Sequence, residues 1–180
     1  MGKKTLKTLL WERLSTPNEL LDLDSRTDEE PEDHFERLYK QGQKDGVVKA
    51  LSGNLYDIVV EGQLHDKSAG FRVLQRALQL CDILGDEKLK PVLKYLLLHE
   101  YNETWGKQFL DIQILAVRAL DGIPKTKSEF KLWYGIAEKR DESLPYALNA
   151  VLEIDLSQGM EVFFYAFLHY HNEDALDKVN

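Results

Sequence analysis

The chain has 180 residues, of which 43% are apolar and 30% are charged, so it can bury the core of one ordinary domain or of a short repeat array. Its 23 basic and 31 acidic residues leave a formal net charge of −8, which disfavours general affinity for nucleic acid or anionic lipid and favours a basic partner. One cysteine excludes an internal disulfide and no apolar run reaches the length of a membrane span, so we expect a cytoplasmic protein with no membrane partner.

The first 30 residues are expected to form an amphipathic helix followed by an acidic linker. The linker prediction rests on residues 22–33, which contain seven acidic side chains and one arginine and therefore favour a solvated segment. The helix would either cover the first repeat or act as a partner-binding or membrane-surface arm. Its apolar stripe, at helical spacing, consists of Leu6, Leu9, Leu10 and Leu14 beside Trp11.

Residues 31–180 are predicted to be one helical-repeat domain. Apolar residues recur there at helical spacing, and glycine, proline and aspartate interrupt the pattern at intervals. The alternation typical of strands is missing, which predicts an all-α fold. The expected helices span residues 31–43, 47–62, 67–84, 87–100, 103–121, 127–140, 143–154, 158–171 and, capped by Asn172, 173–179.

From Leu74 onward the apolar positions repeat every 35 residues. A fixed period of this size is typical of stacked helical hairpins, each of which buries its apolar face against a neighbour. The register also predicts that Cys81 is a small buried residue and not a reactive thiol. The aligned triplets include Leu74/Phe109/Leu144, Ala77/Ile112/Ala147, Cys81/Ala116/Val151, Tyr95/Phe130/Tyr165, Leu97/Leu132/Phe167 and Leu98/Trp133/Leu168.

Residues 73–98 resemble a HEAT-type repeat. The first helix carries Ala77, Leu78, Leu84 and then Gly85-Asp86, and Pro91 follows early in the second helix before a leucine-rich stripe. The resemblance extends over residues 66–172 through the apolar register. It implies a right-handed α-α superhelix, a short solenoid of about four hairpins. HEAT-like proteins are mostly binding scaffolds, with a few enzymes among them.

The sequence contains no pattern of a catalytic, cofactor or metal site. A phosphate-binding glycine loop, a nucleophile elbow and the spacing of zinc ligands are all missing. We therefore expect no enzyme activity and no cofactor. One row of polar-aromatic residues, His99, Tyr134 and His169, occupies equivalent register positions, and it either lines the inner groove of a solenoid or lies half-buried at helix ends.

The C-terminal segment, residues 142–180, is the candidate partner-binding region. It carries seven acidic residues against Lys178 alone, a net charge of −6. The register places Tyr165 and Phe167 in the core, but it places Phe164 and Tyr170 where the other repeats carry solvent-facing residues. These two aromatics either pack under the last helix or form, with Glu161, Glu173 and Asp174, an acid-rimmed patch for a basic protein.

These patterns favour a non-catalytic module whose acidic surface captures a basic protein, for example an inhibitor of the immunity or antitoxin type. A second hypothesis is a scaffold or assembly factor that binds a peptide or helix in the inner groove. A third is a HEAT-like enzyme acting on nucleic acid or on a pigment. The sequence leaves all three open.

Overall fold

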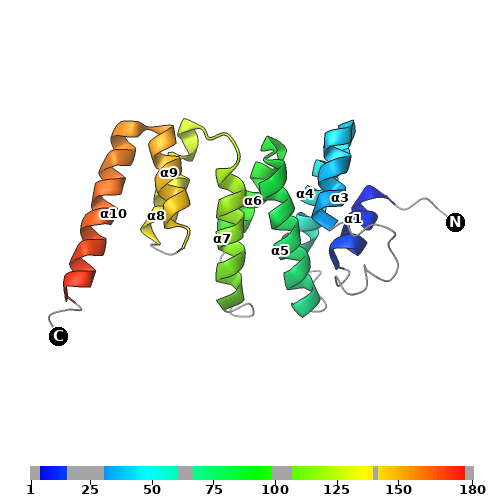
Figure 1. The fold of residues 1–180 in the computed structure, drawn as a ribbon, viewed down its shortest axis with the longest axis horizontal. Helices are drawn as coiled ribbons and strands as arrows, with labels where there is room; N and C mark the ends of the chain where they lie inside the picture. The colour runs from blue at the N-terminus through cyan, green and yellow to red at the C-terminus, as the bar shows by residue number, and fades with distance from the viewer. Residues whose placement is uncertain (1–4, 16–30, 61–66, 99–106, 140–141, 177–180) are drawn as a thin grey trace. The chain divides into compact units, whose positions relative to one another are not determined.

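The computed structural model describes residues 5–15, 31–60, 67–98, 107–139 and 142–176. Every regular element in these ranges is a helix, so the predicted all-α class is confirmed (Figure 1). The chain divides into two compact units, residues 1–123 and residues 124–180. The division expected from the sequence, an N-terminal region over 1–30 and one domain over 31–180, stays a prediction.

Unit 1 contains six α-helices within its described residues, and unit 2 contains three. A π-helical turn, η1 (Tyr39–Gln43), links α3 to α4, and the 3₁₀ turns η2 (Glu87–Leu89) and η3 (Lys127–Glu129) precede α6 and α8. The helices of unit 1 are α1 (Leu6–Ser15), α3 (Pro31–Leu38), α4 (Lys44–Val60), α5 (Lys67–Leu84), α6 (Lys90–Leu98) and α7 (Lys107–Asp121). Those of unit 2 are α8 (Phe130–Glu138), α9 (Leu144–Ile154) and α10 (Leu156–Leu176).

The break between α5 and α6 has a local cause in Gly85 and Asp86. Gly85 has a φ of 55°, a left-handed conformation that glycine adopts at little cost. Asp86 then caps η2, because its Oδ1 atom accepts a hydrogen bond of 2.9 Å from the backbone N–H of Lys88. Gly85 and Asp86 thus end one helix and begin the next.

In unit 1, α5 and α7 pack side by side and in parallel. A Cβ atom on Gly85 would lie 3.4 Å from the carbonyl oxygen of Gly122, so the C-terminal ends of the two helices are in contact. Arg118 Nε also lies 2.8 Å from Asp82 Oδ2 across this pair. The interface is made of small and branched side chains that are fully buried, namely Ala77, Leu80, Cys81, Ile112, Ala116 and Ala119.

In unit 2, α9 packs against both α8 and α10. Trp133, of which 1% is exposed, supplies the largest buried side chain of the unit. The start of α8 is held by a capping box, in which the backbone N–H of Thr126 donates to Glu129 Oε2 at 2.8 Å. That hydrogen bond accounts for the burial of the Glu129 carboxylate, which is 5% exposed.

The apolar register matches buried positions in α5, α7 and α9 but fails in α6, α8 and α10. The triplets Ala77/Ile112/Ala147 and Cys81/Ala116/Val151 are fully buried. In the second helices, by contrast, Leu98 and Leu168 are 70% and 61% exposed. Trp133, their partner in the predicted triplet, is buried. The reason is that α6, α8 and α10 begin at Lys90, Phe130 and Leu156, which are not 35 residues apart.

The predicted boundaries near the C-terminus are wrong. Only Asp155 separates α9 from α10, so the break expected between residues 154 and 158 is one residue long. The Asp155 carboxylate accepts a hydrogen bond from the backbone N–H of Gln158 at 3.1 Å, which caps the start of α10. At its other end α10 continues through Asn172 to Leu176, so no separate helix starts at Glu173.

We predict that Gly159→Ala destabilises unit 2. A Cβ atom at this position would lie 2.7 Å from the backbone of Leu152 and from the carbonyl oxygen of Val151, so α10 would have to move away from α9. The expected loss is about 1–3 kcal/mol of unfolding free energy, measured by urea denaturation. Gly135→Ala is the matched control, because a Cβ atom there meets nothing within 4 Å. It should stabilise the protein by about 0.5–1 kcal/mol through helix propensity.

We also predict that a hydrogen bond between Tyr39 and Asp86 makes the stability of unit 1 pH-dependent in alkali. The Tyr39 hydroxyl donates to Asp86 Oδ2 at 3.0 Å. Burial, and then this hydrogen bond and the charge of Asp86, raise the pKa of Tyr39. A raised pKa means that the stabilisation is complete below the tyrosine pKa of the unfolded chain, about 10. It is lost as the pH rises through the folded-state value.

Tyr39→Phe should therefore lower the unfolding free energy by about 1 kcal/mol at pH 7. The difference between Tyr39→Phe and the unmodified protein should shrink as the pH rises above about 10. Urea denaturation of both proteins across this range measures it. A difference that stays constant with pH would show that the hydroxyl does not act through this bond.

Candidate functional site

A groove between α8 and α10 collects aromatic and acidic side chains in unit 2. Two adjoining cavities of about 640 and 110 Å³ form this groove, and Tyr134, Val162 and Tyr165 line both of them. The helices α8 and α10 form the two walls of the groove, and they run in the same direction. We call this surface the α8–α10 groove; it is completed by Phe130, Ala137, Glu138, Ser157, Gln158, Glu161 and Ala166.

The α8–α10 groove is negatively charged. Its lining includes the carboxylates of Glu138 and Glu161 and no lysine or arginine. Hydrogen bonding to Glu138, the charge of that carboxylate, burial and the neighbouring Tyr165 together raise the pKa of Tyr134. The Tyr134 hydroxyl therefore stays protonated and donates to Glu138. A phenol ring beside two carboxylates is an environment that suits a guanidinium or ammonium group.

A second surface, which we call the outer face of α10, is apolar and exposed. Among the α10 residues whose side chains are described, Gly159 and Ala166 are the buried ones, and Gly159 lies directly against the backbone of α9. The large side chains consequently project from other sides of the helix. Those of the outer face, with their exposed fractions, are Leu156 (70%), Met160 (38%), Phe163 (38%), Phe164 (54%), Phe167 (51%) and Leu168 (61%).

Two residues that the register placed in the core are instead exposed. Tyr165 is 55% exposed and lines the α8–α10 groove, and Phe167 is 51% exposed on the outer face of α10. The prediction fails because α10 buries its glycine and alanine positions, which the register did not identify as the contact face. Phe164 is 54% exposed, although Glu129 at the equivalent register position is buried, and its ring packs edge-on against Phe163 at 6.2 Å between centroids.

The structure brings together part of the predicted partner-binding set. Tyr134 and Glu161 both line the α8–α10 groove, and Phe164 lies on the adjacent outer face of the same helix as Glu161. His99 lies outside the described residues. The remaining predicted residues lie on the C-terminal part of α10, where the structure describes the backbone but not the side chains: His169, Tyr170, Glu173 and Asp174.

Several residues of the two surfaces were missed by sequence reasoning. Phe130 and Glu138 were not identified because the groove depends on how two helices pack on a third. The outer face had a detectable signal, since Leu156, Met160 and Phe163 continue to Phe167 at helical spacing. A helix that is apolar on more than one side has more apolar surface than one neighbour can cover.

Other candidate chemistry is limited within the described residues. Cys81 is fully buried, and burial raises the pKa of its thiol, which disfavours the reactive thiolate. No three described His, Cys, Asp or Glu side chains gather in a way that could hold a metal ion. None of the described helices combines the length and the hydrophobicity that crossing a bilayer requires.

The chain was compared with protein-family models, with curated proteins and with solved structures. None of the three comparisons finds a match. The function therefore has to be inferred from the α8–α10 groove and the outer face of α10 themselves.

Proposed function

We propose that this protein is a non-catalytic, cytoplasmic binding module that captures a basic protein on α10. The observation that carries the proposal is the outer face of α10, where six large apolar side chains are each at least 38% exposed in the described part of the chain. The α8–α10 groove, with its two carboxylates, lies along the same helix and supplies the charge.

The exposed apolar side chains of α10 would provide the affinity for the partner. Scattered exposed apolar residues are normal on a protein surface, but a contiguous patch of them marks an interaction site. Phe163, Phe164 and Phe167 lie within two turns of one helix, and each is at least 38% exposed. Aromatic anchors of this kind provide most of the binding free energy of protein interfaces.

The negative charge of the α8–α10 groove would determine which partners bind. Glu138 and Glu161 line a groove without a basic residue, and residues 142–180 carry a net charge of −6. Such a surface attracts cationic proteins over a distance and speeds their association. It repels phosphate backbones, which argues against the alternative of an enzyme acting on nucleic acid.

The finer form of the proposal is a short HEAT-like solenoid of about four hairpins that acts as an inhibitor of the immunity or antitoxin type. The resemblance of residues 73–98 to a HEAT repeat supports the solenoid, as does the parallel packing of α5 on α7. The inhibitor part of the proposal is an analogy: immunity and antitoxin proteins are often small and acidic, as this chain is, and they block basic toxins.

A scaffold that binds a peptide or helix is the second candidate. The continuity of the two cavities in the α8–α10 groove favours it, because three residues line both and the groove follows the helices. In that case a single extended segment of the partner would lie between α8 and α10, with a basic side chain near Glu138 or Glu161.

The proposal predicts that Phe164→Ala and Phe167→Ala weaken capture of the partner. Full-length protein would be used as bait in the native source, and the captured proteins identified by mass spectrometry. A hot-spot aromatic residue costs about 2 kcal/mol or more when truncated. Each variant should therefore lose at least about thirtyfold in affinity for the purified partner.

Leu98→Ala is the matched control, because Leu98 is 70% exposed but belongs to α6 in unit 1. It should leave the affinity unchanged. A partner that is acidic, or binding that survives both phenylalanine substitutions, would contradict the proposal. Capture of a second copy of the chain would show instead that the outer face of α10 mediates self-association.

A second prediction concerns the rate of association with that partner. Glu161→Gln removes one negative charge from an exposed position of the groove with little change in shape. Since a charge at the edge of an interface acts mainly through steering, the association rate should fall severalfold and depend less on salt. The dissociation rate should change little. Stopped-flow measurements between low and physiological ionic strength test this, and an effect confined to dissociation would rule steering out.

A further inference from the structure

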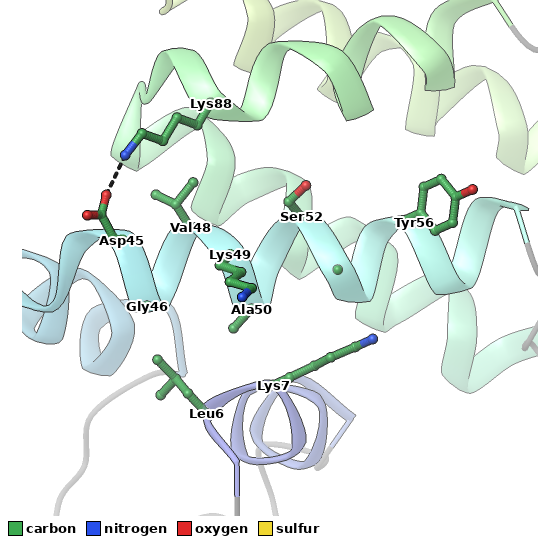
Figure 2. Close-up of a pocket in the computed structure, with 11 residues that line it drawn as sticks. Leu6, Lys7, Asp45, Gly46, Val48, Lys49, Ala50, Ser52, Tyr56 and Lys88 are labelled. Atoms are coloured by element: carbon green, nitrogen blue, oxygen red, sulfur yellow. Dashed lines mark hydrogen bonds and ion pairs between the residues drawn. The ribbon is translucent and has the colours of Figure 1, made fainter.

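Unit 1 contains a large open pocket that the proposed function does not use. Its volume is about 850 Å³, within the range of small-molecule sites in proteins. The exposed side of α4 forms the floor, and Figure 2 shows Leu6 and Lys7 of α1 on one side of α4 and Lys88, just before α6, on the other. We call it the α4 pocket; its lining is Leu6, Lys7, Asp45, Gly46, Val48, Lys49, Ala50, Ser52, Gly53, Tyr56 and Lys88.

The α4 pocket is built by a close crossing of α1 over α4. A Cβ atom on Gly46 would lie 3.2 Å from the Leu6 side chain, and one on Gly53 would lie 3.5 Å from that of Lys7. Asn54, which is 1% exposed, also donates a hydrogen bond of 3.3 Å to the carbonyl oxygen of Lys7. These contacts fix α1 on α4, so the wall of the pocket is part of the packed structure.

The charge of the α4 pocket is opposite to that of the chain. Three lysines and one aspartate line it, although the whole chain carries a net charge of −8. Lys88 is paired with Asp45, as the dashed line in Figure 2 indicates, and Lys7 lies 2.5 Å from Asp57 Oδ2. Lys49, between these two pairs, forms no ion pair with any other described residue and is exposed to solvent.

The remaining lining of the α4 pocket is mostly apolar. Leu6 and the ring of Tyr56, which is 51% exposed, present carbon surface, whereas Val48 and Ala50 are 3% and 4% exposed. Ser52 lies one helical turn from Lys49. A ligand that matches this lining has one anionic group for Lys49 and an apolar body for the surrounding carbon surface.

We propose that the α4 pocket binds a long-chain monocarboxylate, that is, a free fatty acid. Its carboxylate pairs with Lys49 and accepts from the Ser52 hydroxyl, and its tail covers the side chain of Leu6. A basic peptide is disfavoured by the three lysines. The site is independent of the proposed partner surface, because all of its residues belong to unit 1.

The test uses the full-length protein and dodecanoate, kept below its critical micelle concentration, in isothermal titration calorimetry. We expect saturable binding with one site. Dodecyltrimethylammonium, which has the same tail and the opposite charge, should bind at least about tenfold more weakly. Equal binding of the two amphiphiles, or no saturable binding of dodecanoate, overturns the proposal.

Two variants separate the contributions that the charge of Lys49 and the free volume of the pocket make to dodecanoate binding. Lys49→Glu should weaken dodecanoate binding at least about tenfold by reversing the charge at the carboxylate. Ser52→Phe should weaken it as much by filling the pocket. Lys131→Glu makes the same charge change at an exposed lysine of α8, outside the pocket, and should leave binding unchanged. Thermal denaturation checks that each variant is folded.

Loss of binding in Lys131→Glu equal to that in Lys49→Glu would overturn the proposal, because binding would then follow the net charge of the protein. Co-sedimentation with vesicles of phosphatidylcholine and phosphatidylglycerol tests the remaining alternative, an α1 helix that lies on membranes. Vesicle binding that persists in Ser52→Phe, without binding of monomeric dodecanoate, would assign this surface to the membrane instead.

Discussion

At Gly159 the backbone of α10 approaches that of α9 so closely that no side chain fits between them: an added Cβ atom would lie 2.7 Å from Leu152. Close approach through small residues recurs elsewhere. Gly85 faces Gly122 between α5 and α7, and Gly46 and Gly53 face α1 from α4. In α10 the larger side chains lie on other faces of the helix, and these faces form the candidate surface of unit 2. In unit 1, Gly46 and Gly53 themselves line the α4 pocket beside α1.

In unit 2 this constraint explains why α10 is apolar on an exposed side. The contact with α9 buries Gly159, whereas Phe163, Phe164 and Phe167 are 38%, 54% and 51% exposed. In unit 1 the glycines of α4 allow α1 to lie close to α4. The space between α1 and Lys88 forms the α4 pocket. The two surfaces differ in charge, since glutamates line the groove beside α10 and lysines predominate in the α4 pocket. Each surface therefore attracts charges of the opposite sign.

Many of the helices were predictable from the sequence because helix formation depends on residues that are close together in the chain. The boundaries of α5 agree with the sequence prediction, since Gly85 and Asp86 end that helix through backbone conformation and capping. The exposure of Tyr165 and Phe167 was not predictable from the register, because the register assumed that second helices keep the same spacing as first helices.

The sequence by itself determined the all-α class, most helix boundaries and the burial of the first-helix positions around Ala77 and Cys81, because helical periodicity and capping are local properties. Only the tertiary structure decided which face of α10 is buried, and it alone brought Tyr134 and Glu161 into one groove. The physical reason is that these outcomes depend on the distance at which two helices can approach. That distance is set by pairs of residues far apart in the chain, such as Gly46 with Leu6 and Gly85 with Gly122.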